Sequence, residues 1–254
     1  MSLRWITVFL DFPAPGFGSG VTFWQEVTGY RLSPPRGEAG EFATLLPPEG
    51  DAYLRAQRVT DGPGGCHLDL HVDPTAGSLD AVARDAARLG ASVLHRDDED
   101  GLIVAASPGG LAFCLTHWAG ESVVPGPLVT AAGTTRLDTL CIDVPPERFD
   151  EECAFWSGLT GWQARPAPVP GYSYLERPAG PPLPVRILLQ RLDAAPPGQQ
   201  ARAHADFGCT DELAAGRHAG LGARVVATRE YWTVLTDPAG REYCLVSRDP
   251  YLPS

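Results

Sequence analysis

The sequence repeats itself at an interval of roughly 130 residues, and this repeat constrains the fold more than any other feature. The segment CHLDLHVDPTAGSLDAVARDAARLGASVL at 66–94 matches AHADFGCTDELAAGRHAGLGARVV at 203–226. Upstream, FWQEVTGY at 23–30 matches FWSGLTGW at 155–162, and downstream SPGGLAFCL at 107–115 matches DPAGREYCL at 237–245. Because the matches keep one order and nearly one spacing, they indicate an internal duplication.

Each half contains two successive units of one strand, one helix and three strands. Alternating apolar positions indicate strands, and apolar positions three or four residues apart indicate helices. The first half is predicted to have strands at 4–10, 30–32, 41–46, 52–59, 66–72, 92–95, 102–106 and 111–117, and helices at 21–28 and from Leu79 to Leu89. The second half is predicted to have strands at 136–144, 173–176, 185–192, 204–209, 223–227, 232–236 and 241–247.

The ends of the helices and the connections carry their own signals. Ser78 can cap the second helix, Gly29 and Gly90 can end helices, and Phe23, Trp24 and Val27 form a buried stripe. In the second half Phe149, Cys153 and Trp156 are predicted to share the buried face of a helix. Loops are predicted at 12–20, which is turn-rich, and at 165–170 and 178–184, which are rich in proline.

The duplication predicts two domains, since 254 residues suffice for two of a common size. We expect the first at 1–118 and the second at 135–254. The segment 119–134 has small residues and weak periodicity and is predicted to be a linker.

Composition excludes several classes of partner. The net charge of −11 without a basic cluster argues against nucleic-acid binding. No apolar run is long enough to cross a bilayer, so no membrane partner is expected. The apolar run after the N-terminus ends at Asp11 and alternates like a strand, which argues against a secretory signal and favours the cytoplasm. Six cysteines without a C-x-x-C pair indicate reduced, mostly buried thiols.

The combined motifs resemble those of the vicinal oxygen chelate superfamily, the glyoxalase, bleomycin-resistance and dioxygenase proteins. They are FWQEVTGY and FWSGLTGW on the first helix of each half, HLDL from His67, LGA after each second helix and DPAG before the last strand. The sequence is most similar to the glyoxalase-like subgroup in a tandem, two-domain form. This resemblance implies an α+β fold in which each half makes a curled mixed sheet with helices outside.

In metal-dependent members of that superfamily, four strand positions face a cup and hold one divalent ion. The resemblance places these positions in the first half at Ile6, Gln57, His67 and Cys114, and in the second half at Asp138, Gln190, His204 and Cys244. If each cup is assembled across the halves, Ile6 and Gln57 instead join His204 and Cys244, and Asp138 and Gln190 join His67 and Cys114.

The donor chemistry of these positions argues against a resident catalytic metal. Ile6 can donate nothing, so no metal is expected in the first-half set. Asp138, Gln190, His204 and Cys244 offer four donors for zinc or iron, but an amide and a thiol replace the usual imidazole and glutamate. We expect no cofactor, and if a divalent metal is present, we expect it in this second set.

Other residues have a structural interpretation beside a functional one. His67 and Asp69 lie two apart on a strand, share a face, and can pair with each other without any ligand. Trp24 and Trp156 are candidates for the core, and His117 for the surface.

These observations leave three functions open. The first is a protein that binds a small, partly aromatic or apolar molecule in a sheet-lined cup through Gln57, His67, Asp69, Cys114, Asp138, Gln190, His204 and Cys244. The second is a lyase, isomerase or dioxygenase-type enzyme that uses a metal in the second-half site, or His67 or His204 as a base. The third is a structural protein with no small ligand. The sequence leaves the ligand and the oligomeric state open.

Overall fold

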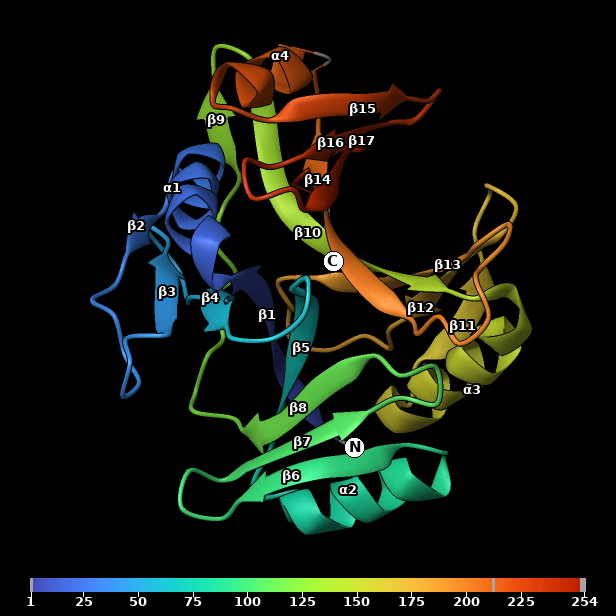
Figure 1. The fold of residues 1–254 in the computed structure, drawn as a ribbon. Coiled ribbons are helices and arrows are strands. Elements are labelled where there is room, and N and C mark those ends of the chain that lie inside the picture. Colours follow the sequence, from blue (N-terminus) through green and yellow to red (C-terminus); the bar gives the residue numbers. More distant parts are fainter. Residues whose placement is uncertain (1, 212, 252–254) are drawn as a thin grey trace. The chain divides into compact units, whose positions relative to one another are not determined.

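The computed structural model describes residues 2–211 and 213–251 and shows an α+β protein with two large mixed sheets (Figure 1). The first half contains β1 (Leu3–Pro13), α1 (Phe17–Thr28), β2 (Arg31–Leu32), β3 (Phe42–Leu46), β4 (Leu54–Val59), β5 (Gly65–Val72), α2 (Leu79–Arg88), β6 (Ser92–Asp97), β7 (Leu102–Ala106) and β8 (Ala112–His117). The second contains β9 (Leu128–Thr130), β10 (Gly133–Val144), α3 (Phe149–Thr160), β11 (Gln163–Pro166), β12 (Tyr172–Glu176), β13 (Arg186–Arg191), β14 (Arg202–Cys209), α4 (Leu213–Gly220), β15 (Arg224–Thr228), β16 (Trp232–Thr236) and β17 (Glu242–Ser247).

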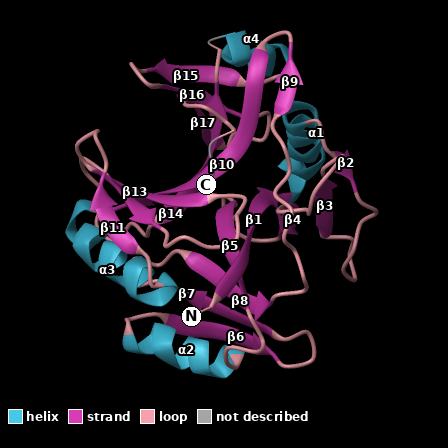
Figure 2. Ribbon diagram, turned by 180° about the vertical axis from the view of Figure 1, so that it is seen from behind, coloured by secondary structure: helices cyan, strands magenta, loops and turns pink. Residues whose placement is uncertain are grey.

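The strand order is the same in both sheets, which confirms the predicted tandem repeat. The first sheet runs β2-β3-β4-β1-β5-β8-β7-β6 and the second β11-β12-β13-β10-β14-β17-β16-β15, with β9 added alongside β10. In the first sheet β1 pairs in parallel with β4 and β5 with β8, while the outer pairs are antiparallel. Figure 2 distinguishes the sheets from the helices by colour.

The residues pack into two compact units, and each unit takes segments from both sequence halves. Unit 1 contains the chain as far as Thr7, together with His67–Ser122 and Cys141–Ala203. Unit 2 contains Val8–Cys66, Val123–Leu140 and the chain from His204 onward. Each of these packing units therefore combines one β-α-β-β-β motif from each sequence half.

The helix ends follow from local sequence. Ser78 precedes α2, and its hydroxyl accepts a hydrogen bond from the Ala81 amide, as the capping prediction requires. Gly29 and Gly161 end α1 and α3 with φ of 72° and 75°, the left-handed conformation that glycine adopts at little cost. Trp24 and Trp156 are 1% and 0% exposed, so both belong to the core as predicted.

Three local predictions were wrong. The loop predicted at 12–20 contains a 3-10 turn (Ala14–Gly16) and the first residues of α1, because Pro15 suits the start of a helix. The predicted loop at 165–170 begins inside β11, whose four residues are all exposed and so lack the alternation that marks a half-buried strand. The segment 119–134, which we predicted as a linker, includes β9, and β9 pairs with β10.

The third error concerns the buried face of α3. Glu152, Phe155, Trp156 and Leu159 are buried, whereas Phe149 and Cys153 are only partly covered. A glutamate on the buried face breaks the apolar pattern on which the prediction depended.

Within residues 2–211 and 213–251, no helix combines the length and the apolar character needed to cross a membrane.

Candidate functional site

Strand alternation gives each unit a face that packs on its helices and a face turned away from them, which we call the distal face. In unit 2, Phe207 of β14 stacks on Trp24 of α1, with ring centroids 5.8 Å apart. His204 and Asp206 have the opposite parity on β14 and therefore lie on the distal face. In unit 1, Phe113 of β8 packs against Phe155 of α3, so the neighbouring Cys114 is distal.

Three potential ligand residues meet on the distal face of unit 2. His204, Asp206 and Cys244 each offer a donor atom, and these atoms all lie within 4.8 Å of one another. Asp206 and Cys244 are opposite each other in the parallel β14–β17 pair, and His204 Nε2 lies 3.3 Å from Asp206 Oδ1. The histidine side chain is 15% exposed, so the cluster can be reached from outside.

The thiol of this cluster is protonated at neutral pH. Burial raises the pKa of Cys244 to about 11, against the opposing effect of a hydrogen bond with His204. An ion that binds this sulfur must therefore displace a proton, so its affinity would rise with pH.

Unit 1 has the same cluster on its distal face. His67, Asp69 and Cys114 again bring their donor atoms within 4.8 Å of one another, and Asp69 faces Cys114 across the β5–β8 pair. His67 Nε2 lies 3.7 Å from Asp69 Oδ1. The pairing of histidine with carboxylate that the sequence suggested is thus present in both units.

The other predicted site positions have different surroundings. Ile6 is fully buried. The Asp138 carboxylate, also fully buried, accepts from Arg248 Nη2 and, at 3.2 Å, from Arg248 Nε. Gln190 Oε1 lies 4.0 Å from the Cys141 thiol in unit 1, and Gln57 lies opposite Phe42 in unit 2.

The packing units divide these positions into different sets from the sequence halves. Gln57 belongs to the same unit as His204 and Cys244, and Gln190 to the same unit as His67 and Cys114. Asp138 belongs to unit 2 and Ile6 to unit 1.

Sequence reasoning missed two members of these faces. Asp206 was matched to Asp69 in the repeat but not proposed for a site, although its place two residues after His204 was a visible signal. Cys141 was missed because its equivalent in the first half is Phe9, so the repeat gave no hint of a polar role.

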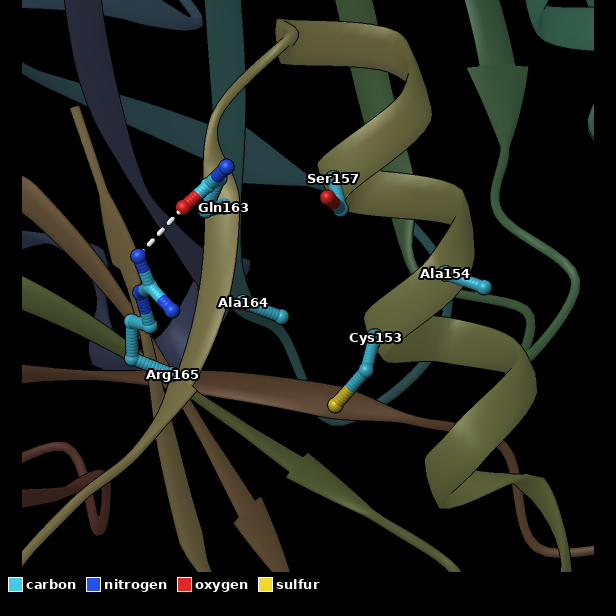
Figure 3. A pocket seen from close by; sticks show the side chains of 6 residues that line it. All are labelled: Cys153, Ala154, Ser157, Gln163, Ala164 and Arg165. Carbon is cyan, nitrogen blue, oxygen red and sulfur yellow. Dashed lines mark hydrogen bonds between the residues drawn. The ribbon is translucent and has the colours of Figure 1, made fainter. Parts of the chain in front are cut away.

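A separate hollow of about 330 Å³ opens between α3 and β11 of unit 1 (Figure 3). It is lined by Cys153, Ala154, Ser157, Gln163, Ala164 and Arg165. Arg165 is committed to Glu176 at 2.9 Å and to Gln163 at 2.5 Å. Burial raises the pKa of Cys153 to about 11, so the thiol is not an activated nucleophile at neutral pH.

The donor sets fit a borderline-soft divalent ion better than a hard one. Neighbouring donors around tetrahedral zinc are roughly 3.3–3.8 Å apart, given bonds of about 2.0–2.3 Å. The His204–Asp206 and His67–Asp69 separations of 3.3 and 3.7 Å fall in this range. A thiol favours zinc over manganese or magnesium. Each cluster supplies three donors, which would leave one position open.

The fold and these repeated clusters define the class of protein. The sequence matches the glyoxalase-like domain family over residues 7–116 and again over 139–246, so the chain belongs to that family, with two copies in tandem. No protein with a curated description matches the sequence.

Solved structures with the same fold include a Mn(II)-bound glyoxalase and several dioxygenases. The chain is similar to the Mn(II)-bound glyoxalase from Novosphingobium aromaticivorans, with 15% identity, a TM-score of 0.66, and coverage of 96% of this chain and 81% of that one. It is also similar to 2,2',3-trihydroxybiphenyl 1,2-dioxygenase from Sphingomonas wittichii strain RW1, with 16% identity, a TM-score of 0.65, and coverage of 96% and 90%. A 2,3-dioxygenase from Pseudomonas sp. KL28 gives 12% identity, a TM-score of 0.64, and coverage of 100% and 95%. At these identities the likeness establishes the fold alone.

Proposed function

We propose that the protein binds a small, partly aromatic or apolar molecule on the distal faces of its units, without a resident catalytic metal. The observation that carries this proposal is the repetition of one partly accessible polar cluster, His204, Asp206 and Cys244 in unit 2 and His67, Asp69 and Cys114 in unit 1. A mostly apolar surface with a few convergent polar groups is typical of small-molecule sites.

Binding without a metal is supported by what the neighbouring residues do. Asp138, the one carboxylate among the eight positions that the resemblance assigns to metal ligands, is paired with Arg248, and Ile6 supplies no donor. In unit 2 one of the three donors of the cluster is a protonated thiol, from which an ion would have to displace a proton. Within each cluster the imidazole lies close to the carboxylate, an arrangement that needs no ion.

The proposed site of unit 2 consists of Gln57, His204, Asp206 and Cys244, and that of unit 1 of Gln190, His67, Asp69 and Cys114. This grouping can be tested by mutational coupling. His204→Ala should weaken binding of an aromatic ligand to unit 2, and adding Gln57→Leu should weaken it by less than the two separate effects together, because the residues share one site. Adding Gln190→Leu instead should be additive. His117→Ala, at an exposed histidine, is the matched control.

Calorimetry with a panel of flat aromatic metabolites measures these effects. If no member of the panel binds saturably to the wild-type protein, the binding proposal fails. If Gln190 rather than Gln57 couples to His204, the grouping by sequence halves is the correct one.

A second candidate is a metal-dependent lyase, isomerase or dioxygenase-type activity, favoured by the three donors within 4.8 Å. His204, Asp206 and Cys244 would hold the ion, which would act as a Lewis acid on a bound substrate oxygen. Elemental analysis of the purified protein decides between the candidates. Stoichiometric zinc lost in both His204→Ala and Cys244→Ser would favour the enzyme, and its absence from the wild type would favour binding alone.

A further inference from the structure

The hollow between α3 and β11 of unit 1 is separate from the polar clusters of the distal faces. Because α3 forms one of its walls, the hollow lies on the helix-covered side of the sheet. Its volume of about 330 Å³ is within the range of small-molecule sites. Since each water takes up about 30 Å³ of the liquid, the hollow has room for roughly ten water molecules.

Short side chains from the helix and the strand face each other across this hollow. Cys153 and Ser157 point from α3 toward β11, and Ala164 points back toward α3 (Figure 3). Because these side chains are short, they leave the gap between the two elements open. The Ser157 hydroxyl donates to the Trp162 carbonyl at 2.5 Å, so its lone pairs can accept a further hydrogen bond.

The hollow carries no unbalanced charge. Arg165 is the one charged side chain among the six that line it, and its guanidinium donates to Glu176 Oε2 at 2.9 Å and to Gln163 Oε1 at 2.5 Å. An anionic ligand would have to compete with Glu176 for this arginine. Because burial raises the pKa of Cys153 to about 11, the thiol adds no charge at neutral pH. A neutral ligand is therefore favoured over an ionised one, which would lose hydration without gaining an unpaired partner.

Unit 2 has larger side chains at the equivalent positions. The two helices align over their full length, and β11 pairs with β12 as β2 pairs with β3. This alignment places Val21, Gln25 and Leu32 where unit 1 has Cys153, Ser157 and Ala164. Val21 is 4% exposed, whereas Cys153 is only half-buried. The short side chains around the hollow are therefore particular to unit 1 and are not a requirement of the shared fold.

We infer that this hollow is a second small-molecule site, which takes a neutral molecule with an N–H or O–H group that donates to Ser157 Oγ. The volume limits such a ligand to about ten non-hydrogen atoms, roughly one for each water that it displaces. The Ala164 methyl group offers a contact to the apolar part of the ligand. The site goes beyond the proposed function, because it shares no residue with the distal faces.

Protection of Cys153 from alkylation tests the inference, because this thiol is half-buried and the other five cysteines are buried. The probes are benzamide, which is neutral and carries N–H donors, and benzoate, which shares the ring but is charged. Labelling with iodoacetamide at pH 9 is followed by mass spectrometry of the peptide that contains Cys153. At twice its dissociation constant benzamide should slow the labelling about threefold, and benzoate at the same concentration should leave the rate unchanged.

Two variants test the walls of the site. Ala164→Leu, which introduces the residue of unit 2 at an exposed strand position, should abolish protection because leucine fills the hollow. Ser157→Ala keeps the hollow open but removes the acceptor, and should weaken benzamide binding about fivefold. His67→Ala, on the distal face, is the matched control and should leave protection unchanged. Circular dichroism checks that each variant is folded, and Ser157→Ala suffices if Ala164→Leu does not fold.

Three results would overturn the inference and leave the proposed function untouched. These are labelling that benzamide never slows, protection that persists in the variants of Ser157 and Ala164, and equal protection by benzoate. Protection that is lost in His67→Ala would place the probe on the distal face and would also exclude the hollow as its site.

Discussion

Each unit buries an equivalent tryptophan against a carboxylate, but the carboxylate belongs to a helix in unit 1 and to a turn in unit 2. In unit 1, Trp156 Nε1 donates to Glu152 at 3.2 Å, and both residues lie on α3. In unit 2, Trp24 Nε1 donates at 2.8 Å to Asp237, which lies in the turn between β16 and β17. The two tryptophans are equivalent in the repeat, but the two acids are not.

In each unit the carboxylate also accepts hydrogen bonds from the turn between two strands. Glu152 accepts from the Ser107 hydroxyl and, at 3.0 Å, from the Gly109 amide in the turn between β7 and β8. Asp237 accepts at 2.9 Å from the amides of Ala239 and Arg241 in its own turn. Each acid thus joins a helix to the turn of the other β-α-β-β-β unit.

Steric room decides which side supplies the acid. Gly20 is the equivalent of Glu152, and a Cβ there would lie 2.2 Å from the Phe12 ring. Unit 1 has Val144 where unit 2 has Phe12, which leaves room for a long side chain on α3. The comparison teaches that the repeat preserved a buried acceptor under the indole rather than a particular residue.

A second pair of regions differs by charge. Asp138 and Arg248 form a buried ion pair in unit 2, whereas the equivalent positions in unit 1 are Ile6 and Trp118. Arg4 stacks over Trp118 at 4.5 Å from the ring centre. These equivalent positions are thus stabilised by an ion pair in unit 2 and by apolar and cation–π contacts in unit 1.

The largest effect should come from breaking this ion pair. Asp138→Ala leaves a largely buried guanidinium without its carboxylate and should lower the free energy of unfolding by about 3–5 kcal/mol. Asp138→Ile combined with Arg248→Trp, which copies unit 1, should recover most of the loss. Urea denaturation measures both. A double variant as unstable as the single one would show that the two places are not interchangeable.

The next largest loss of stability should come from removing the acid under the indole of unit 1. Glu152→Gly removes the acceptor of three donors in unit 1 and should cost about 3 kcal/mol. Adding Ser107→Asp moves the acid to the turn, as in unit 2, and should restore roughly half of this. Ser107→Asp alone places two acids together and is the control that must be destabilising. Thermal and urea unfolding of the four proteins complete the cycle.

The smallest effect of the three depends on pH and concerns His218 of α4. This residue is fully buried, its Nδ1 lies 3.0 Å from the Tyr243 hydroxyl, and Nε2 has no hydrogen-bond partner within residues 2–211 and 213–251. Burial, and then the charge of Arg217, lower its pKa to about 3. Ala86 and Phe113 take these places in unit 1.

Because the folded pKa lies below the unfolded value of about 6.5, the unfolded chain binds more protons between these two values. Stability should therefore fall as the pH drops below about 6.5, by roughly 2 kcal/mol at pH 5. His218→Ala with Tyr243→Phe, which copies unit 1, should remove this dependence. Denaturation at pH 7 and pH 5 measures it, and an unchanged difference in the double variant would exclude His218 as the cause.

The sequence predicted the fold and part of the site. The repeat, the alternation around His67 and the helix-ending glycines depend on residues close in the chain, and these predictions hold. The partner of Asp138 could not be predicted, since Arg248 is 110 residues away and its counterpart in the repeat is a tryptophan. The strand β11 was not predicted because all four of its residues are exposed, so its sequence lacks the alternation of apolar and polar residues that marks a half-buried strand.

The composition of the units has a consequence for how the protein is made. When the first half of the chain has emerged from the ribosome, the residues that cover Phe113 have not yet emerged. In the folded protein the rings of Phe155 and Trp156 lie 5.8 and 5.4 Å from the Phe113 ring. Unit 1 needs the chain as far as Ala203, and unit 2 needs segments beyond it. Neither hydrophobic core can close during synthesis of the first half, so the nascent chain must carry apolar surface until most of its length has emerged.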